Sequence, residues 1–159
     1  MDNTYLSQDL IRIEMFEIQE RLVHNGISVA DIAAAASEHA NRISENPPDI
    51  QEITRRITHF LTDPNVSSLL LAAILLEDEL IANRPNSEIA DDPLWLLSDE
   101  FIGIAIAEVI AGPKGKFAFT IYDQNKPGII RKLGPFLDDA IAGLAAGCVC
   151  NEAIVPMNR

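Results

Sequence analysis

Apolar side chains recur every three or four residues along the first part of this chain, which is the spacing of one helical face. Such stripes run through residues 10–18, 29–43 and 50–60. A side chain able to cap a helix N-terminus precedes each stripe, and glycine or proline follows the first two. These punctuating residues are Ser7, Ser28, Asp49, Gly26 and the pair Pro47-Pro48. The pattern therefore predicts three amphipathic helices.

Two further segments are apolar with little polar interruption. Asp63-Pro64 opens the first of them with a cap and a proline suited to the first helical position, and residues 66–76 are then apolar all round. A helix without a polar face belongs inside a bundle, so we expect residues 64–82 to form a central helix surrounded by the others. After a polar loop, a fifth helix is expected from Asp92-Pro93 to about Gly112.

The last part of the chain gives a less uniform signal. The segment KFAFTIYD (116–123) fits either a short strand or another helical stretch, whereas Lys126-Pro127-Gly128 predicts a turn. Pro135 opens a last helix that runs to about Asn151. These elements predict an all-α fold of about six helices, in a single domain over residues 1–159.

Composition supports helices and narrows the choice of partners. Hydrophobic residues make up 48% of the chain and aromatic residues only 6%. The net charge of −12 opposes binding to nucleic acid or to an anionic membrane, and it suits a cation site. The apolar runs are shorter than a bilayer requires, and the polar, acidic start has no secretory signal. We therefore expect a soluble cytoplasmic protein, and the high aliphatic content predicts a homo-oligomer.

The cysteines and histidines carry no metal-binding pattern. Cys148 and Cys150 are two positions apart on a predicted helix, so they point to different faces and are interpreted as core thiols in a reducing compartment. His24, His39 and His59 are scattered, and we interpret them as surface residues.

Acidic side chains occur at three places where the surrounding pattern is apolar. Asp99 and Glu100 lie within the fifth helix, Asp138 and Asp139 open the last one, and Asp123 lies between them. Buried carboxylates without a partner are costly, so these groups should be paired, hydrated or bound to metal. Clustered carboxylate oxygens suit a hard cation, and Mg²⁺ in proteins takes one or two carboxylates together with water and phosphate oxygens.

Small residues and cations complete this candidate site. Gly103, Gly143 and Gly147 would let the two acid-bearing helices pack closely, so that their acidic turns converge. Lys126 and Arg131 could bind the outer oxygens of a phosphate. The alternative is that Asp138 and Asp139 are only first-turn acids, which the helix dipole favours at a solvated helix start. The acids of residues 77–79 could face the same site, but a solvated helix end is the favoured interpretation.

Three segments, in this order, resemble the phosphatidylglycerophosphatase A family: SDEFIG (98–103), YDQNKPGII (122–130) and FLDDAIAGLAAG (136–147). The first half, with GISVADI (26–32) and DPNVSSLLLAAILLEDEL (63–80), resembles the soluble branch of that family. This branch includes archaeal α-ribazole-5′-phosphate phosphatases of the CobZ type and YutG-like proteins. The resemblance covers most of the chain.

The resemblance implies a Mg²⁺-dependent phosphomonoester hydrolase on an all-helical fold. The implied metal ligands are Asp99, Glu100, Asp138 and Asp139. The implied catalytic residues are Asp123, Lys126, Asp138 and Asp139, with Lys126 and Arg131 binding the substrate phosphate. The nucleophile stays open between water and an aspartate, and so does the number of metal ions.

The substrate expected first is α-ribazole-5′-phosphate, in the assembly of the lower ligand of cobalamin. Phosphatidylglycerophosphate met at a membrane surface is the second candidate. It ranks lower because the chain lacks the spanning helices and the glycine-rich N-terminal motif of the membrane-bound members. A non-enzymatic acidic helical binding module is the alternative from another class.

Overall fold

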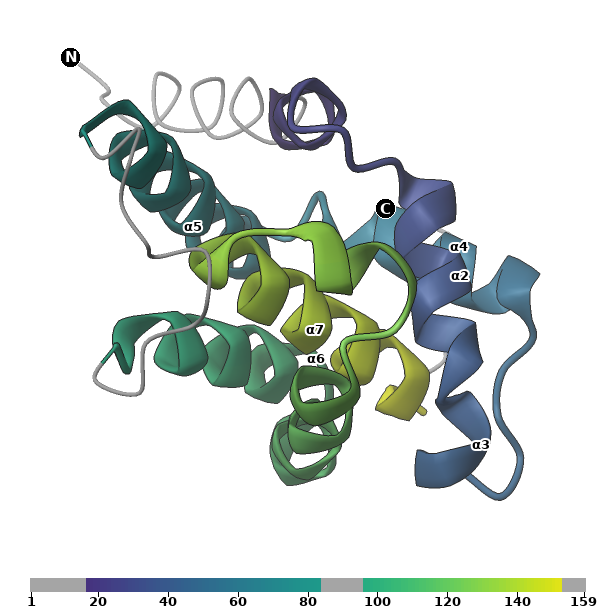
Figure 1. The fold of residues 1–159 in the computed structure, drawn as a ribbon. Coiled ribbons are helices and arrows are strands. Elements are labelled where there is room, and N and C mark those ends of the chain that lie inside the picture. The colour runs from purple at the N-terminus through teal and green to yellow at the C-terminus, as the bar shows by residue number, and fades with distance from the viewer. Residues whose placement is uncertain (1–16, 84–95, 153–159) are drawn as a thin grey trace, which may run out of the picture.

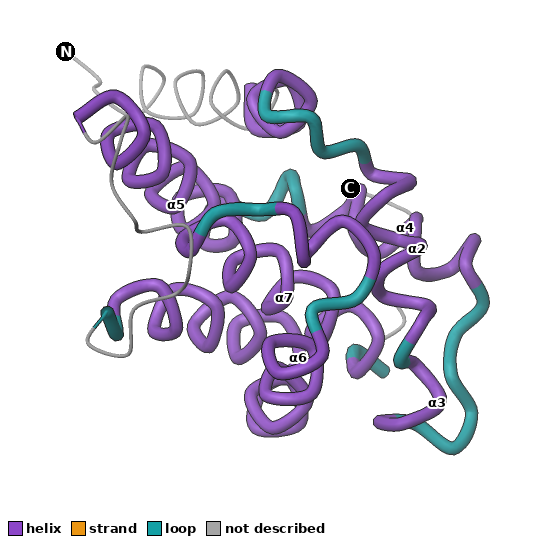
Figure 2. The backbone as a smooth tube through the Cα atoms, in the orientation of Figure 1, coloured by secondary structure: helices purple, strands orange, loops and turns teal. Residues whose placement is uncertain are grey.

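The fold is given by a computed structural model, which describes residues 17–83 and 96–152 (Figure 1). The predicted helix starts at Ser7 and at Asp92-Pro93 lie outside the described residues. Residues 17–24 are helical, and no strand occurs in the two described ranges (Figure 2). The elements that follow are α2 (Val29–Glu38), α3 (Ala40–Ile43), α4 (Ile50–Phe60), α5 (Pro64–Asn83), α6 (Ser98–Asn125), a short 3₁₀ helix η1 (Gly128–Lys132) and α7 (Pro135–Cys150). The all-α prediction is confirmed.

The helix starts predicted from capping residues form as expected. The Asp31 amide donates to Ser28 Oγ and the Ser28 amide donates to Asp31 Oδ2, both at 3.1 Å, which makes a reciprocal capping box. At the start of α4 the Glu52 amide donates to Asp49 Oδ1 at 2.8 Å. The predicted second helix is not continuous, however, because the backbone leaves helical geometry at His39 and divides it into α2 and α3.

The central helix of the bundle is α7. Its residues are buried from Pro135 to Val149, and α2, α4, α5 and α6 pack around it (Figure 1). The prediction of a central helix at residues 64–82 was wrong about which helix takes this place, because α5 leaves Leu75 52% exposed and Leu76 42% exposed. Alanine and glycine make α7 thin enough for neighbours to approach on every side. In α5 the side chains are bulky leucines, and only one face of α5 is packed against the rest of the bundle.

The backbones of α6 and α7 touch where glycines face each other. A Cβ added to Gly143 would overlap the carbonyl oxygen of Gly103 and lie 2.9 Å from its carbonyl carbon. A Cβ on Gly103 would lie 2.5 Å from the carbonyl oxygen of Asp139, and one on Gly147 would lie 2.8 Å from Ile110 Cβ. The predicted close approach of these two helices is therefore confirmed.

A kink divides α6 into two helical halves. Gly112 has φ 61° and ψ −149°, and Pro113 follows it, so the predicted helix end at this glycine is confirmed. Residues 116–123 continue as a helix, which decides between the two possibilities left open for KFAFTIYD. The second half leaves the first at an angle, and its Phe119 ring reaches back to the position where Gly103 lacks a Cβ.

Side chains from other helices satisfy both ends of α7. At the N-terminus, Glu77 Oε2 of α5 accepts hydrogen bonds from the amides of Phe136 at 3.0 Å and Leu137 at 3.4 Å. At the C-terminus, Arg56 Nη1 of α4 donates to the Cys148 carbonyl at 3.0 Å. Glu77 is only 4% exposed, so its interpretation as part of a solvated helix end was wrong. A buried helix needs such partners because its terminal backbone groups cannot reach water.

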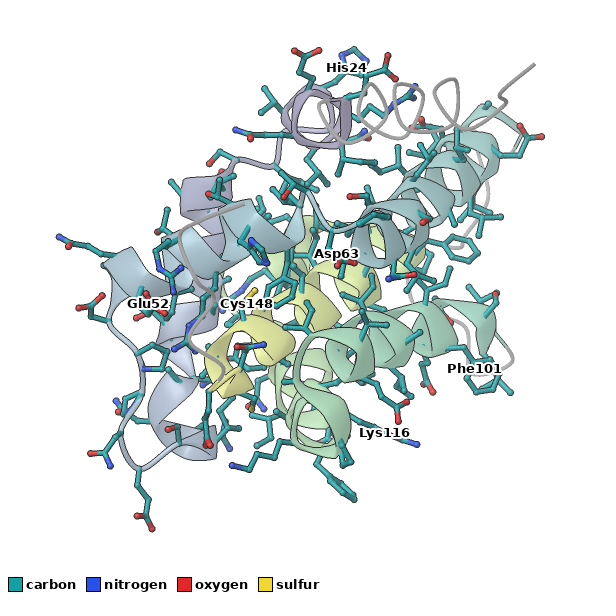
Figure 3. All side chains as sticks on the ribbon, turned by 180° about the vertical axis from the view of Figure 1, so that it is seen from behind. His24, Glu52, Asp63, Phe101, Lys116 and Cys148 are labelled. Atoms are coloured by element: carbon teal, nitrogen blue, oxygen red, sulfur yellow. The ribbon has the colours of Figure 1, made fainter. Side chains whose placement is uncertain are left out.

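The cysteines and histidines occupy plain structural positions. Both thiols are free; Cys148 is buried inside the bundle and Cys150 is half-buried. His24 and His59 are exposed, and Figure 3 shows His24 at the outer edge of the bundle. His39 is half-buried, with its ring edge-on to Tyr122 at a centroid distance of 6.1 Å. None of the helices in the described ranges has the length and apolar character needed to span a membrane.

Gly143→Ala tests the backbone contact between α6 and α7. Glycine to alanine inside a helix normally adds about 1 kcal/mol of stability, but the new methyl here has no space. We expect a net loss of about 1–3 kcal/mol in the free energy of unfolding, measured with urea. Ala34→Gly, on the exposed side of α2, is the control: it measures how much an exchange of alanine and glycine changes the stability of this protein through helix propensity alone. An alanine variant more stable than the wild type would contradict the contact.

Candidate active site

Three of the predicted acids are buried where α6 and α7 begin. Asp99 and Asp139 have no exposed surface, and Asp138 is 4% exposed. Asp99 lies one turn before Gly103, and Asp139 lies one turn before Gly143. Residues four apart share a helix face, so the contact between the two glycines places both aspartates on the packed faces of their helices. The acidic turns converge as the sequence predicted.

Lys126 joins this group from the other end of α6. It is the C-terminal cap of that helix, and its Nζ lies 2.5 Å from Asp138 Oδ2. Its backbone is left-handed, with φ 41° and ψ 61°, and it is the only residue other than glycine with positive φ in the described ranges. Non-glycine residues rarely adopt this geometry unless their surroundings hold them there, and such positions concentrate at functional sites. The predicted turn at Lys126-Pro127-Gly128 is confirmed.

Asp139 is the most perturbed carboxyl of the group. Burial raises its pKa first, and the nearby charges of Asp138, Asp123 and Asp99 raise it further, to about 9. A side-chain hydrogen bond shared with the neighbouring carboxyl of Asp123 also raises this pKa, and no N–H group of the described residues reaches either Asp139 carboxylate oxygen. Asp139 therefore holds a proton at neutral pH unless another cation takes the place of that proton.

The donor set of this group fits Mg²⁺ in part. It consists of carboxylate oxygens, and no N–H group of the described residues reaches the enclosed oxygens of Asp139. As the side chains are placed, however, no three Asp, Glu, His or Cys side chains in residues 17–83 and 96–152 lie close enough together to coordinate one metal ion. An ion that keeps water and phosphate oxygens as ligands needs only one or two carboxylates. The residues can therefore supply the protein part of such a site.

Two predicted site residues lie outside the buried group. Glu100 is exposed, because it follows Asp99 by one position and so points about 100° away around the helix. Arg131 on η1 is 59% exposed, and its Nη2 lies 3.7 Å from Glu38 Oε1. Arg131 still touches the Lys126 turn, because its Nε donates to the Lys126 carbonyl at 3.2 Å. The metal role of Glu100 and the phosphate role of Arg131 stay predictions.

A separate groove of about 1040 Å³ lies at the opposite end of α7. Arg56, Lys114, Cys150 and Asn151 are among its lining residues. Two of its cations form ion pairs: Arg56 Nε lies 2.7 Å from Glu52 Oε1, and Lys114 Nζ lies 2.7 Å from Glu152 Oε1. The group at the start of α7 is the better candidate for phosphate chemistry, because there a cation, Lys126, lies beside buried carboxylates that could hold a metal ion.

The family model for phosphatidylglycerophosphatase A matches residues 26–153. The chain belongs to this family. Membership of the phosphatidylglycerophosphatase A family indicates a phosphatase. An uncharacterized protein of Methanocaldococcus jannaschii is 46% identical over 123 residues, a match that covers 75% of this chain and 92% of that protein.

Solved structures of similar fold extend the comparison. YpjQ from Bacillus subtilis superimposes with a TM-score of 0.75 at 23% identity, over 88% of this chain and 92% of that one. The low temperature requirement C protein from Listeria monocytogenes gives a TM-score of 0.73 at 21% identity, over 86% and 92% of the two chains. At these identities the likeness shows a shared fold alone.

Sequence reasoning missed the buried position of Glu77, which contacts the helix that carries Asp138 and Asp139. One signal was available. Glu77 follows Leu70 by seven residues and Ala73 by four, and both of these are buried. This spacing places Glu77 on the core-facing stripe of α5.

Asp139→Asn tests the electrostatics of the group. The folded protein keeps the Asp139 proton up to a pKa of about 9, whereas the unfolded chain releases it near the ordinary pKa of 3.8. The folded state binds more protons between these values, so the wild type should lose stability as pH rises through that window. In EDTA at pH 8 we expect the asparagine variant to melt several degrees above the wild type, with the gap closing toward pH 4.

The control for this measurement is Glu100→Gln, which removes a neighbouring carboxylate that is exposed. We expect no comparable gap in melting temperature between this variant and the wild type. If Asp139→Asn and Glu100→Gln follow the same pH curve, the perturbation of Asp139 is absent.

Proposed function

We propose that this protein is a Mg²⁺-dependent phosphatase that hydrolyses a soluble phosphate monoester. The observation that carries the proposal is the enclosed Asp139 carboxyl, which has Asp138, Asp123 and Asp99 as charged neighbours. Such a concentration of carboxyl groups is unfavourable in a core unless a proton or a metal cation offsets the negative charge, and a metal ion can take the place of the Asp139 proton. The family assignment then supplies the reaction class.

The proposed metal ligands are Asp99, Asp138 and Asp139, with Glu100 at the exposed margin. When bound, Mg²⁺ would offset negative charge on the carboxylates and on the phosphate oxygens. The carboxylates would hold this cation, and their burial excludes bulk water from this side of the site. The same burial strengthens every charge interaction there.

Lys126 is the proposed phosphate-binding cation. Its ammonium group is held at Asp138 by a 2.5 Å contact, so the positive charge is in place before the substrate arrives. A fixed cation stabilises the charge that develops on phosphate oxygens during hydrolysis. Asp123, in the last turn of α6 and half-buried, is the proposed group that accepts a proton from an attacking water or attacks the phosphate itself.

The preferred substrate is α-ribazole-5′-phosphate, which carries its phosphate on a water-soluble nucleoside. The net charge of −12 and the lack of a spanning helix in the described ranges support a soluble ester. One observation favours phosphatidylglycerophosphate as the second candidate. Leu97 and Phe101 flank Asp99 in the sequence, and they are 52% and 65% exposed, so apolar surface adjoins the first turn of α6. Figure 3 shows Phe101 at the outer side of this helix.

Release of inorganic phosphate from both substrates decides between these candidates. With purified protein and Mg²⁺ we expect turnover of α-ribazole-5′-phosphate, loss of that turnover in EDTA, and slower or no turnover of phosphatidylglycerophosphate in detergent micelles. The reverse preference would assign the lipid substrate. Absence of turnover of either ester, with or without metal, would support the non-enzymatic binding module.

Lys126→Met tests the phosphate-binding role. Removing one charged donor that is placed for the transition state typically costs about 10²–10³ in kcat, and we expect a loss of that order. Lys132→Met is the matched control, since Lys132 is an exposed lysine six positions later in the chain. The control should keep wild-type turnover. Equal activity of the two variants would remove Lys126 from the site.

A further inference from the structure

Glu77 contacts the start of the helix that carries Asp138 and Asp139. It belongs to α5, far from these residues in sequence, and only 4% of its surface is exposed. A single oxygen, Oε2, accepts both hydrogen bonds, from the Phe136 amide at 3.0 Å and from the Leu137 amide at 3.4 Å. These amides are among the first N–H groups of α7, which have no partner within the helix itself.

The chain leaves space for this carboxylate. A Cβ on Gly134, the N-terminal cap residue of α7, would overlap Glu77 Oε1 and lie 2.5 Å from Glu77 Cδ. Gly134 itself provides no side-chain cap. Its carbonyl instead accepts a hydrogen bond from the Asp138 amide at 2.9 Å. Glu77 thus packs against the first turn of α7, and the backbone of that turn leads directly to Asp138.

We propose that Glu77 is a positioning residue for the carboxylates at the start of α7. The inference rests on the proposed phosphatase function. The two bonds to Oε2 fix the rotation and axial position of the first turn of α7 relative to α5. Asp138 and Asp139 follow within two residues of Leu137, so the position of this first turn determines where their carboxylates lie. A misplacement of about 1 Å at a catalytic group can cost about 10²-fold in rate.

Arg56 offers a matched comparison at the other end of the same helix. It also caps α7 from a neighbouring helix, through its 3.0 Å bond to the Cys148 carbonyl. Cys148 lies ten residues after Asp138, or about 15 Å along the helix axis. Loss of either cap should destabilise the fold, whereas only loss of the Glu77 cap should disturb the carboxylates.

The hydrogen bonds to Glu77 predict a different effect for each substitution at this position. Because one oxygen accepts both bonds, the amide oxygen of Glu77→Gln can replace it and keep both bonds without the charge. Glu77→Ala leaves two buried amides without an acceptor. Glu77→Asp keeps the charge but withdraws the carboxylate by one methylene.

The experiment compares the wild type with Glu77→Ala, Glu77→Gln and Arg56→Met. Urea unfolding gives stability, and the rise of melting temperature with Mg²⁺ concentration gives the metal-binding midpoint without any substrate. For the ester that the wild type hydrolyses, kcat and KM are measured separately. We expect Glu77→Ala and Arg56→Met both to lose stability. Only Glu77→Ala should raise the Mg²⁺ midpoint about tenfold or more and lower kcat by about 10–100-fold.

The Gln variant should restore both the midpoint and kcat to within a few fold of the wild type. If Glu77→Ala does not fold, Glu77→Asp replaces it in the comparison, with the same direction of change expected. Glu77 variants that keep the wild-type Mg²⁺ midpoint and kcat, as Arg56→Met does, would overturn the positioning role alone. A wild type that shows neither a Mg²⁺ response nor hydrolysis would overturn the proposed function, and this inference with it.

Discussion

Full burial of α7 is the constraint on which the rest of this structure depends. A helix exposed on one side can satisfy its terminal backbone groups with water, but α7 is buried from Pro135 to Val149 and cannot. Its neighbours therefore supply the missing partners. Glu77 accepts from the first amides and Arg56 donates to a terminal carbonyl, each with the sign that the helix dipole favours. The acidic group sits in the same helix, so its geometry depends on contacts made by α5 and α6.

Local features of the fold were predictable because short-range chemistry decides them. The capping box at Ser28, the break at Gly112 and the turn around Lys126 each depend on a few adjacent residues, and each was read correctly. The identity of the central helix was not predictable in this way. An apolar surface marks a helix for burial, but the number of neighbours that can approach depends on side-chain bulk. The leucines of α5 were therefore a weaker guide than the alanines and glycines of α7.

The candidate site was predictable to the same extent and for the same reason. Ordered acidic turns and facing glycines indicated that Asp99, Asp138 and Asp139 would meet, and these residues are buried together. The exposure of Glu100 follows from the helical rotation between neighbours and was open to prediction. The burial of Glu77 depended on how α5 lies against the start of α7, which is a long-range arrangement. No local pattern fixes such a contact, although the spacing from Leu70 pointed toward the core.

The kink at Gly112 has a geometric consequence for this arrangement. The site uses both ends of α6, with Asp99 in the first turn and Asp123 and Lys126 at the last. In a straight helix Asp99 and Asp123, 24 residues apart, would lie about 36 Å from each other along the axis. The two ends can share a site only because the chain reverses part of that length at one residue. The backbone torsion angles of Gly112 therefore bring the two ends of α6 together at the site, although Gly112 itself is many residues away from every carboxylate in it.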